Sequence, residues 1–259
     1  MSEAIIPDVE ASPPLAPAPR DPPWGYLDLL LILTAVIIGE VVVLLLGFAV
    51  SRIIPQLATM NFRQLVEVPL YVIAVQTFSY GIVLAVMWAT VEVRAQHNFF
   101  DAIHWKLPPR ILMFAALGSV LAYVVLIISK YLPFPPKVPI EKFFGDPKSA
   151  YAMMAFGLLV APFMEEVFFR GLLFPVLKRT FGLAAAMGVT AFLFALMHHG
   201  QLAGAWAPLA VLFAVGLVLT AVRVWSGSVA ACWITHLAYN GTLFATIYYF
   251  SNGFRNMTR

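Results

Sequence analysis

Three charged residues lie inside an apolar stretch, where each charge is unfavourable unless it is paired or has a function. Glu165, Glu166 and Arg170 occur in APFMEEVFFRG, residues 161–171. A charge at the centre of a membrane-spanning helix costs at least about 2.5–3.5 kcal/mol. Glu166 and Arg170 are four apart with the acid first, the favourable order for an ion pair on one helical face. Glu165 is turned about 100° away. It has no partner at that spacing, so its carboxylate is free to act on something else.

Imidazole and amide side chains follow in later apolar stretches. His198 and His199 end one of these stretches, and His236 and Asn240 lie in the last one. His236 and Asn240 are four apart and therefore share a helical face. Because His198 and His199 are adjacent, they point in different directions, and we expect at most one of them to join a common site.

The depth of these residues can be compared by counting along helices. Glu165 and His198 are equally distant from the turn at residues 181–182. In an antiparallel helix pair both reach about 25 Å from that turn, at 1.5 Å per residue. His236 lies about 14 Å from the next turn on the same side, at Gly227. The spacing is therefore compatible with one shared site.

Such a cluster suits hydrolysis by an activated water molecule. A carboxylate in an apolar, partly hydrated cavity can act as a general base on water, and an imidazole can share that water or carry its proton. A second imidazole and an amide can donate hydrogen bonds to an oxyanion. Glu165, His198 and His236 would equally supply three ligands to a zinc ion with an open position. Both mechanisms stay open on the sequence alone.

The same residues also have non-catalytic interpretations. They could form a polar network that associates helices, or a pathway for protons or ions. Other protease patterns are absent: no His-Glu-x-x-His occurs. Ser228 lies eight residues before His236, which is about 12 Å along a helix and too far for a Ser–His pair.

Seven apolar stretches are long enough to hold these residues in a bilayer, since a spanning helix needs about 20 residues. The sequence therefore predicts an all-α fold, a polytopic transmembrane helical bundle of about seven spans, or eight if one stretch is broken or re-entrant. Lys and Arg divide almost evenly between the two sides and predict no orientation. The stretches are residues 29–50, 68–91, 111–129, 150–177, 183–199, 202–222 and 228–250.

The composition excludes whole classes of protein. Of the 259 residues, 61% are hydrophobic and 11% are charged, against about 45–50% and about 25% in soluble domains. An ordinary water-soluble enzyme and a nucleic-acid-binding protein are both excluded. The net charge of +3 comes without a basic cluster, which places basic loop residues beside anionic lipid. We expect a multi-pass protein of the cell membrane, in contact with membrane lipids. A single cysteine, Cys232, allows no internal disulfide.

Composition also divides the chain. Residues 1–24 carry seven prolines and four acidic residues and are expected to form a flexible tail. Residues 25–149 supply N-terminal membrane helices and an interfacial loop, residues 132–149, which is rich in proline and lysine. Residues 150–250 form the expected catalytic core, and residues 251–259 form a short C-terminal tail.

Three motifs in this order resemble those of the CPBP family, the CAAX protease and bacteriocin-processing group, also called Abi. Residues 165–170 resemble its Glu-Glu-x-x-x-Arg motif. Residues 194–198, FALMH, resemble its Phe-x-x-x-His motif, and residues 236–240, HLAYN, resemble its His-x-x-x-Asn motif. The resemblance covers about residues 150–250, and the first 149 residues add only membrane spans.

This resemblance implies an intramembrane endopeptidase, similar to the type II CAAX prenyl endopeptidase that removes the last three residues of prenylated proteins. It implies that Glu165 activates water with His198 as its partner. His236 and Asn240 would stabilise the oxyanion or bind a metal, for which the possible Zn²⁺ ligands are Glu165, His198 and His236. Glu166 and Arg170 would give structural support.

The resemblance also leaves alternatives. Members are often described as metalloproteases, whereas a metal-free glutamate mechanism has also been proposed, and we favour the metal-free version. The expected substrate is a peptide or protein, either prenylated or otherwise membrane-anchored. The family typically has eight helices, against the seven predicted here. Alternative functions are a non-enzymatic bacteriocin-immunity or partner-binding protein, and an ion-coupled transporter.

Overall fold

The structure is a computed structural model that describes residues 21–255. These residues form only helices and loops, which confirms the all-α prediction. Many large apolar side chains on the outer helices are exposed, among them Leu27, Ile37 and Leu112, as expected for surfaces that face lipid. Five of the described helices are long and apolar enough to cross a membrane: Tyr26–Ser51, Pro69–Arg94, Ile111–Ser129, Pro147–Met197 and Trp206–Ser226.

The fourth and fifth predicted stretches lie in one continuous helical run. Its 51 residues would extend about 77 Å if straight, more than twice the thickness of a hydrocarbon core of about 30 Å. The run bends at Gly182, whose φ of 77° lies in the left-handed region that favours glycine. Two spans therefore fit into it. It consists of α6 (Pro147–Ala155), η3 (Phe156–Val160), α7 (Ala161–Glu166), η4 (Val167–Leu173) and α8 (Phe174–Met197), with η3 and η4 π-helical.

Two further helices complete the C-terminal part: α9 (Trp206–Ser226) and α10 (Val229–Phe250). The last predicted stretch coincides with α10, although α10 is not among the five helices above. Its polar residues, including His236 and Asn240, lower its hydropathy. The number of spans therefore stays a prediction.

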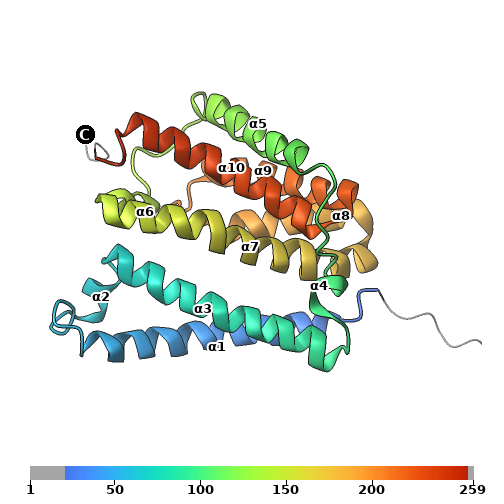
Figure 1. Ribbon diagram of the computed structural model, residues 1–259, viewed down its shortest axis with the longest axis horizontal. Coiled ribbons are helices and arrows are strands. Elements are labelled where there is room, and N and C mark those ends of the chain that lie inside the picture. The colour runs from blue at the N-terminus through green and yellow to red at the C-terminus, as the bar shows by residue number, and fades with distance from the viewer. Residues whose placement is uncertain (1–20, 256–259) are drawn as a thin grey trace, which may run out of the picture.

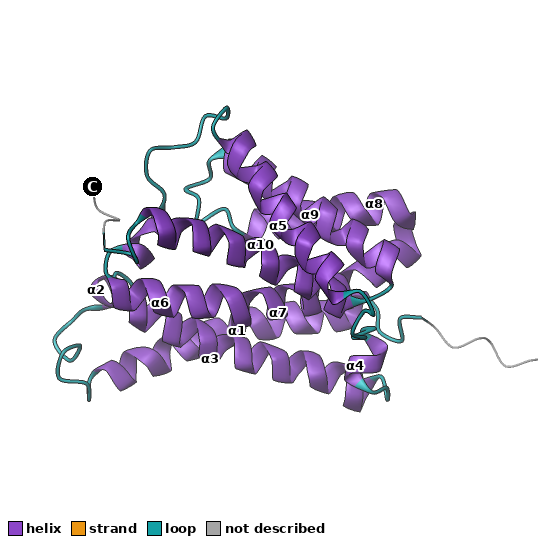
Figure 2. Cartoon of the chain, turned by 45° about the horizontal axis from the view of Figure 1, so that its top comes forward, coloured by secondary structure: helices purple, strands orange, loops and turns teal. Residues whose placement is uncertain are grey.

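We call the part of the run from α6 to η4, which carries Glu165, Glu166 and Arg170, the motif helix. The helices form a layered bundle with this motif helix in the middle (Figures 1 and 2). On one side of α6 and α7 lies a hairpin of α1 (Tyr26–Ser51) and α3 (Pro69–Ala89). On the other side α10 packs along α5 (Ile111–Ser129), and α9 packs on α8. The α5–α10 contact is close at Gly118, where a side chain would overlap the Thr235 carbonyl oxygen. Two layers of helices therefore enclose α7 from both sides.

Polar contacts hold the α1–α3 hairpin together. Glu40 of α1 accepts hydrogen bonds from Ser79 Oγ at 2.8 Å and from Gln76 Nε2 at 3.1 Å. Near one end Arg94, in the π-helical turn η1 (Thr90–Arg94) that follows α3, pairs with Asp28 at 2.5 Å. The intramembrane Glu40 is thus satisfied inside its own hairpin.

The segment before α1 is fixed to the motif helix. Trp24 is buried, and its Nε1 donates to the Leu172 carbonyl oxygen at 2.9 Å. Arg179 of α8 donates to the carbonyl oxygens of Pro22 and Trp24. Of the predicted N-terminal tail only residues 21–24 are described, so the prediction for residues 1–20 lies outside the described residues.

Near the C-terminal end of the described residues, Phe254 is buried, and its ring centroid lies 6.1 Å from that of Phe144.

Short helices lie in the loops: α2 (Phe62–Leu65), α4 (Phe99–Ala102) and the 3₁₀ helix η2 (Pro139–Phe144). We call η2 the strap, because it ties together two other connections. The Ile140 backbone N–H donates to the Gln201 carbonyl oxygen at 3.2 Å, and Lys142 Nζ donates to the Val66 carbonyl oxygen at 2.8 Å. The strap therefore links the α2–α3 and α8–α9 connections at one end of the bundle.

Candidate active site

Glu166 and Arg170 form the ion pair that their spacing predicts. Arg170 Nη1 lies 3.0 Å from Glu166 Oε1, and both side chains are completely buried. Arg170 Nη2 also donates to the Gly216 carbonyl oxygen of α9 at 2.9 Å. Breaking such a buried pair by removing one partner typically costs about 3–5 kcal/mol. The pair therefore fixes the motif helix against α9.

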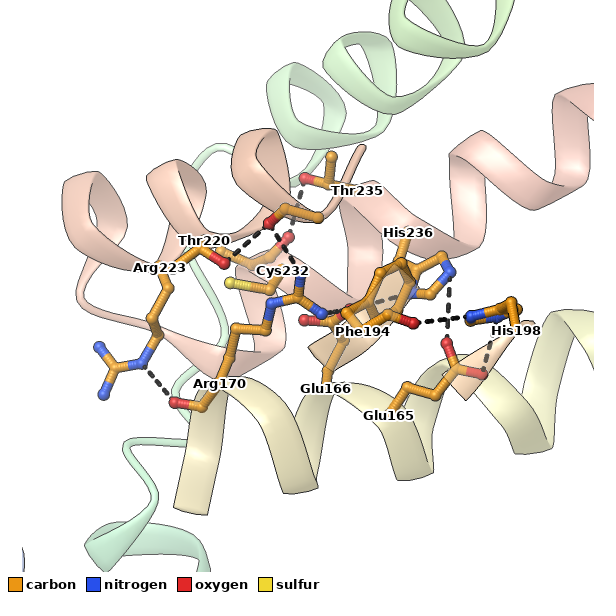
Figure 3. A network of polar contacts seen from close by, with 12 residues as sticks. Glu165, Glu166, Arg170, Phe194, His198, Thr220, Arg223, Cys232, Thr235 and His236 are labelled. Atoms are coloured by element: carbon orange, nitrogen blue, oxygen red, sulfur yellow. Dashed lines mark hydrogen bonds and ion pairs between the residues drawn. The ribbon is translucent and has the colours of Figure 1, made fainter. Parts of the chain in front are cut away.

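Glu166 has a second partner that the sequence did not predict. His236 Nδ1 lies 2.8 Å from the same Glu166 Oε1 (Figure 3). Because a carboxylate paired with Arg170 can only accept, His236 donates its Nδ1–H to it. In a neutral imidazole this leaves Nε2 with a free lone pair. That Nε2 lies 3.8 Å from Glu165 Oε2.

His198 is oriented in the same way by the backbone. Its Nδ1 lies 2.8 Å from the Phe194 carbonyl oxygen, which can only accept, so the Nδ1–H is the donor. His198 Nε2 then lies 3.9 Å from Glu165 Oε1. The Phe194 ring also stacks 4.8 Å below the Arg170 guanidinium. One turn of α8 therefore fixes the imidazole and covers the ion pair.

The Glu165 carboxylate consequently lies between two imidazoles, one facing each of its oxygens (Figure 3). Separations of 3.8–3.9 Å are too long for direct hydrogen bonds, but one water molecule can bridge each of them. Glu165, His198 and His236 line a cavity of about 350 Å³. The side chains of His198 and Glu165 are 17% and 9% exposed. The three predicted residues are therefore brought together around a space that can hold a water molecule and part of a substrate.

Asn240 lines the same cavity. Its Nδ2 donates to the Gly157 carbonyl oxygen at 2.8 Å. In a π-helical turn this carbonyl would accept from residue 162, five positions later, but Pro162 has no N–H. Asn240 thus supplies a donor beside a proline in the motif helix, and it retains a second N–H.

His199 does not line the cavity that His198 and His236 share. Its backbone carbonyl accepts a hydrogen bond from the Gly204 N–H in the α8–α9 loop. Only one of the two adjacent histidines therefore joins the cluster.

Residues 147–242 match the family described as type II CAAX prenyl endopeptidase Rce1-like. This segment is an Rce1-like domain. It contains all three motifs and every residue of the cluster described above. No curated protein and no solved structure matched the chain. Because the family is one of proteases, the Rce1-like domain supports a peptidase, and the five apolar helices make the chain a multi-pass membrane protein.

Residues outside the Rce1-like domain complete its cavity. Gln76 and Tyr80 come from α3, and Ile140 and Phe144 come from the strap. The Tyr80 ring stacks on Phe156 at 5.7 Å. Sequence reasoning missed these residues. The available signal was that Gln76 and Tyr80 are polar side chains in a stretch otherwise treated as a plain membrane span.

The donors around Glu165 match zinc in type but not in spacing. Zinc bound at about 2.0–2.2 Å to tetrahedral ligands holds their donor atoms about 3.3–3.6 Å apart. Here the two Nε2 atoms lie 3.9 and 3.8 Å from the Glu165 oxygens. Within residues 21–255, no group of three or more His, Cys, Asp and Glu side chains has the arrangement of a metal site. The Rce1-like domain in this arrangement therefore does not fit a zinc ion without a shift of its side chains.

Proposed function

We propose that this protein is an intramembrane endopeptidase that hydrolyses a peptide bond with water activated by Glu165 and His198. The observation that carries the proposal is the position of the Glu165 carboxylate between two imidazole Nε2 atoms, in a cavity of the Rce1-like domain. The orientation of each imidazole is fixed by a hydrogen bond at its Nδ1 atom. Such preorganisation suits general base catalysis.

The first step uses a water molecule between Glu165 Oε1 and His198 Nε2, which are 3.9 Å apart. Water donates to both atoms, so its oxygen lone pair is directed into the cavity. As the water oxygen bonds to the substrate carbonyl carbon, its proton passes to Glu165 and the carbonyl oxygen becomes an oxyanion. When the C–N bond then breaks, Glu165 returns the proton to the departing amine nitrogen.

His236 and Asn240 stabilise the oxyanion in this mechanism. Asn240 can donate its second N–H, and His236 can donate from Nε2 when it is protonated. In that state the charges of Glu165, Glu166, Arg170 and His236 sum to zero inside the bundle, so the buried cluster carries no net charge. Donors held in place for an oxyanion are typically worth about 10²–10³ in rate.

The substrate we propose carries an apolar group beside its scissile bond. A second cavity, of about 280 Å³, adjoins Glu165 between α1, α3 and α7. Apolar side chains line it, including Val36, Met87 and Phe168, and its polar Glu40 is already hydrogen-bonded within the hairpin. This cavity can bury an acyl-like or isoprenoid chain or a large apolar side chain. A prenylated or otherwise membrane-anchored peptide in the cell membrane meets this requirement.

The test compares protein termini by mass spectrometry in membranes from cells that express wild type or Glu165→Gln at equal levels. The matched control is Glu67→Gln: the Glu67 side chain is 72% exposed, its ion pair with Lys142 of the strap is at the surface, and neither residue lines the cavity. New termini are expected with wild type and Glu67→Gln and are expected to be lost with Glu165→Gln.

A synthetic prenylated peptide, incubated with purified protein in vesicles, keeps the test independent of the host cell. Cleavage of this peptide that persists in Glu165→Gln would overturn the role of Glu165. Identical termini in all strains, together with no peptide cleavage by wild type, would instead favour a non-enzymatic binding function.

A further inference from the structure

A second polar cavity, of about 400 Å³, lies at the end of the bundle where several connections meet. None of the residues that line it also lines the cavity at Glu165. It is therefore separate from the proposed peptidase site. Its charged and polar lining comes from four segments: Asp21 before α1, His104 after α4, Lys178 and Arg179 of α8, and Arg223 at the end of α9.

Arg223 is buried in this cavity with most of its donors unused. Only 9% of the residue is exposed. Its Nε donates to the Arg170 carbonyl oxygen at 3.3 Å. Its two terminal nitrogens make no hydrogen bond or ion pair with any residue from 21 to 255, and in Figure 3 they point away from the Arg170 carbonyl. The residue as a whole is mostly buried, but these two nitrogens are accessible from the cavity, so a ligand that enters the cavity can reach them.

The charge of the cavity is not neutralised by its own residues. Three cationic side chains face one carboxylate, that of Asp21, and no ion pair within 4.0 Å joins Asp21 to a described residue. Arg179 is bound only to neutral backbone carbonyl oxygens. Burial, followed by the charge of Arg223, lowers the pKa of His104 below its usual 6.5. The cavity is therefore selective for an anion.

We propose that this cavity binds the phosphate group of an anionic membrane lipid. A guanidinium fork together with a lysine ammonium is the usual protein partner of a phosphate group. Two exposed aromatic residues lie within two residues of this lining in the sequence: Trp225 follows Val224 and is 64% exposed, and Phe181 is two residues after Arg179 and is 60% exposed. Aromatic residues mark the interface between membrane and water. A headgroup there can enter the cavity while its acyl chains stay beside the apolar helices.

The binding site also reaches the motif helix. Arg223 bonds the backbone of Arg170, which in turn pairs with Glu166. A lipid that binds only the folded protein stabilises it by mass action. Bound lipid should therefore raise the thermal stability of the whole Rce1-like domain, whether or not the protein is a peptidase.

The experiment titrates purified full-length protein in detergent with short-chain phosphatidylglycerol, and measures bound lipid by native mass spectrometry and stability by thermal unfolding. Variants are Arg223→Gln and Lys178→Gln, with Arg63→Gln as control because Arg63 is exposed on α2 at the other end of the bundle (Figure 1). Lys178 is also exposed, so its variant should fold even if Arg223→Gln does not.

Wild type and Arg63→Gln should bind lipid equally. Arg223→Gln should bind about tenfold more weakly, since hydrogen bonds to charged groups are worth about 1.5–3 kcal/mol. Lys178→Gln should bind several-fold more weakly. If inorganic phosphate displaces the lipid, free phosphate is also a ligand of this cavity. If inorganic phosphate has no effect, the ligand is the lipid itself. Equal lipid binding by wild type, Lys178→Gln and any folded Arg223→Gln would overturn the proposal.

Discussion

Glu166 Oε1 accepts a hydrogen bond from His236 Nδ1 at 2.8 Å across 70 residues of sequence, while the same oxygen holds Arg170. The carboxylate that spacing identifies as structural is therefore also the group that sets the tautomer of a proposed catalytic imidazole. The two glutamates of the motif face the two ring nitrogens of the same histidine: Glu166 is hydrogen-bonded to Nδ1, and Glu165 lies 3.8 Å from Nε2.

Glu166→Gln tests this link. The amide keeps the shape of the side chain but loses its charge, so His236 loses its fixed orientation and Arg170 loses its ionic partner. Partners that orient a functional histidine typically matter by about 10–100-fold. We expect a loss of that size in kcat for a prenylated peptide, measured in vesicles. Thermal unfolding of the same samples separates this loss from unfolding, and undiminished kcat would contradict the assigned role.

His198 and His199 offer a matched pair of adjacent residues. In the proposed mechanism His198→Gln removes the nitrogen that shares a water molecule with Glu165, and we expect activity to fall by about 10²–10⁴, the usual range for general acid–base groups. His199→Gln should leave activity within about twofold of wild type, since His199 lies outside the cavity. Equal losses in the two variants would show that the observed orientation of the imidazoles is not the functional one.

The spacing around Glu165 predicts insensitivity to chelators. Its oxygens lie farther from the imidazole nitrogens than zinc ligands lie from one another. We expect peptidase activity to survive prolonged incubation with a strong chelator, and elemental analysis of purified protein to find far less than one zinc per chain. Activity that is lost on chelation and restored by added zinc would establish the metal-dependent mechanism instead.

Gly118→Ala should disturb the site although Gly118 does not line it, because it changes the contact between α5 and α10. A methyl group at Gly118 overlaps the carbonyl oxygen of Thr235, the residue before His236. The α5–α10 contact must then open, which for such overpacking typically costs about 1–3 kcal/mol. We expect a lower thermal unfolding temperature together with reduced activity. Gly81→Ala is the control, because a side chain there meets nothing within 4 Å, and it should behave as wild type.

Asp146 provides a test of pH dependence outside the membrane spans. It caps α6, and hydrogen bonds from Ser149 hold its pKa below the usual 3.8. A carboxylate with a lowered pKa stabilises the fold above its unfolded-state pKa, and this contribution disappears as the pH falls through the folded-state pKa. Asp146→Ala should therefore cost about 1 kcal/mol at pH 7, with a smaller difference from wild type below about pH 4.

Thermal unfolding of wild type and Asp146→Ala from pH 7 to pH 3 measures this difference. Asp146→Asn is the control, since an asparagine caps a helix without titrating. A difference between wild type and Asp146→Ala that is independent of pH would contradict the assignment of the cap to the ionised carboxyl.

Much of the site geometry follows from spacing along single helices. The i, i+4 rule predicts the Glu166–Arg170 pair, and counting from the turn at Gly182 predicts that Glu165 and His198 reach the same depth. The structure contains the pair, and it places those two side chains 3.9 Å apart. Both results depend on approximate helical spacing along one segment of chain, and they hold although the π-helical η4 lies in that segment.

Contacts between distant helices could not be predicted in this way. The spacing within α10 places His236 on a face but does not say which helix that face meets, so its bond to Glu166 was missed. Tyr80 and the strap residues were missed for the same reason, since no period connects them to the motifs. The roles of the cluster residues in catalysis remain predictions.

The apolar cavity between the α1–α3 hairpin and the motif helix has a consequence for measured rates. A lipid-anchored substrate that reaches Glu165 through this cavity diffuses in two dimensions, so its effective concentration is a surface density. Diluting such a substrate with inert lipid then slows the reaction even though the molarity in the tube is unchanged. Kinetic constants measured with such a substrate therefore take their natural units as mole fractions in the bilayer.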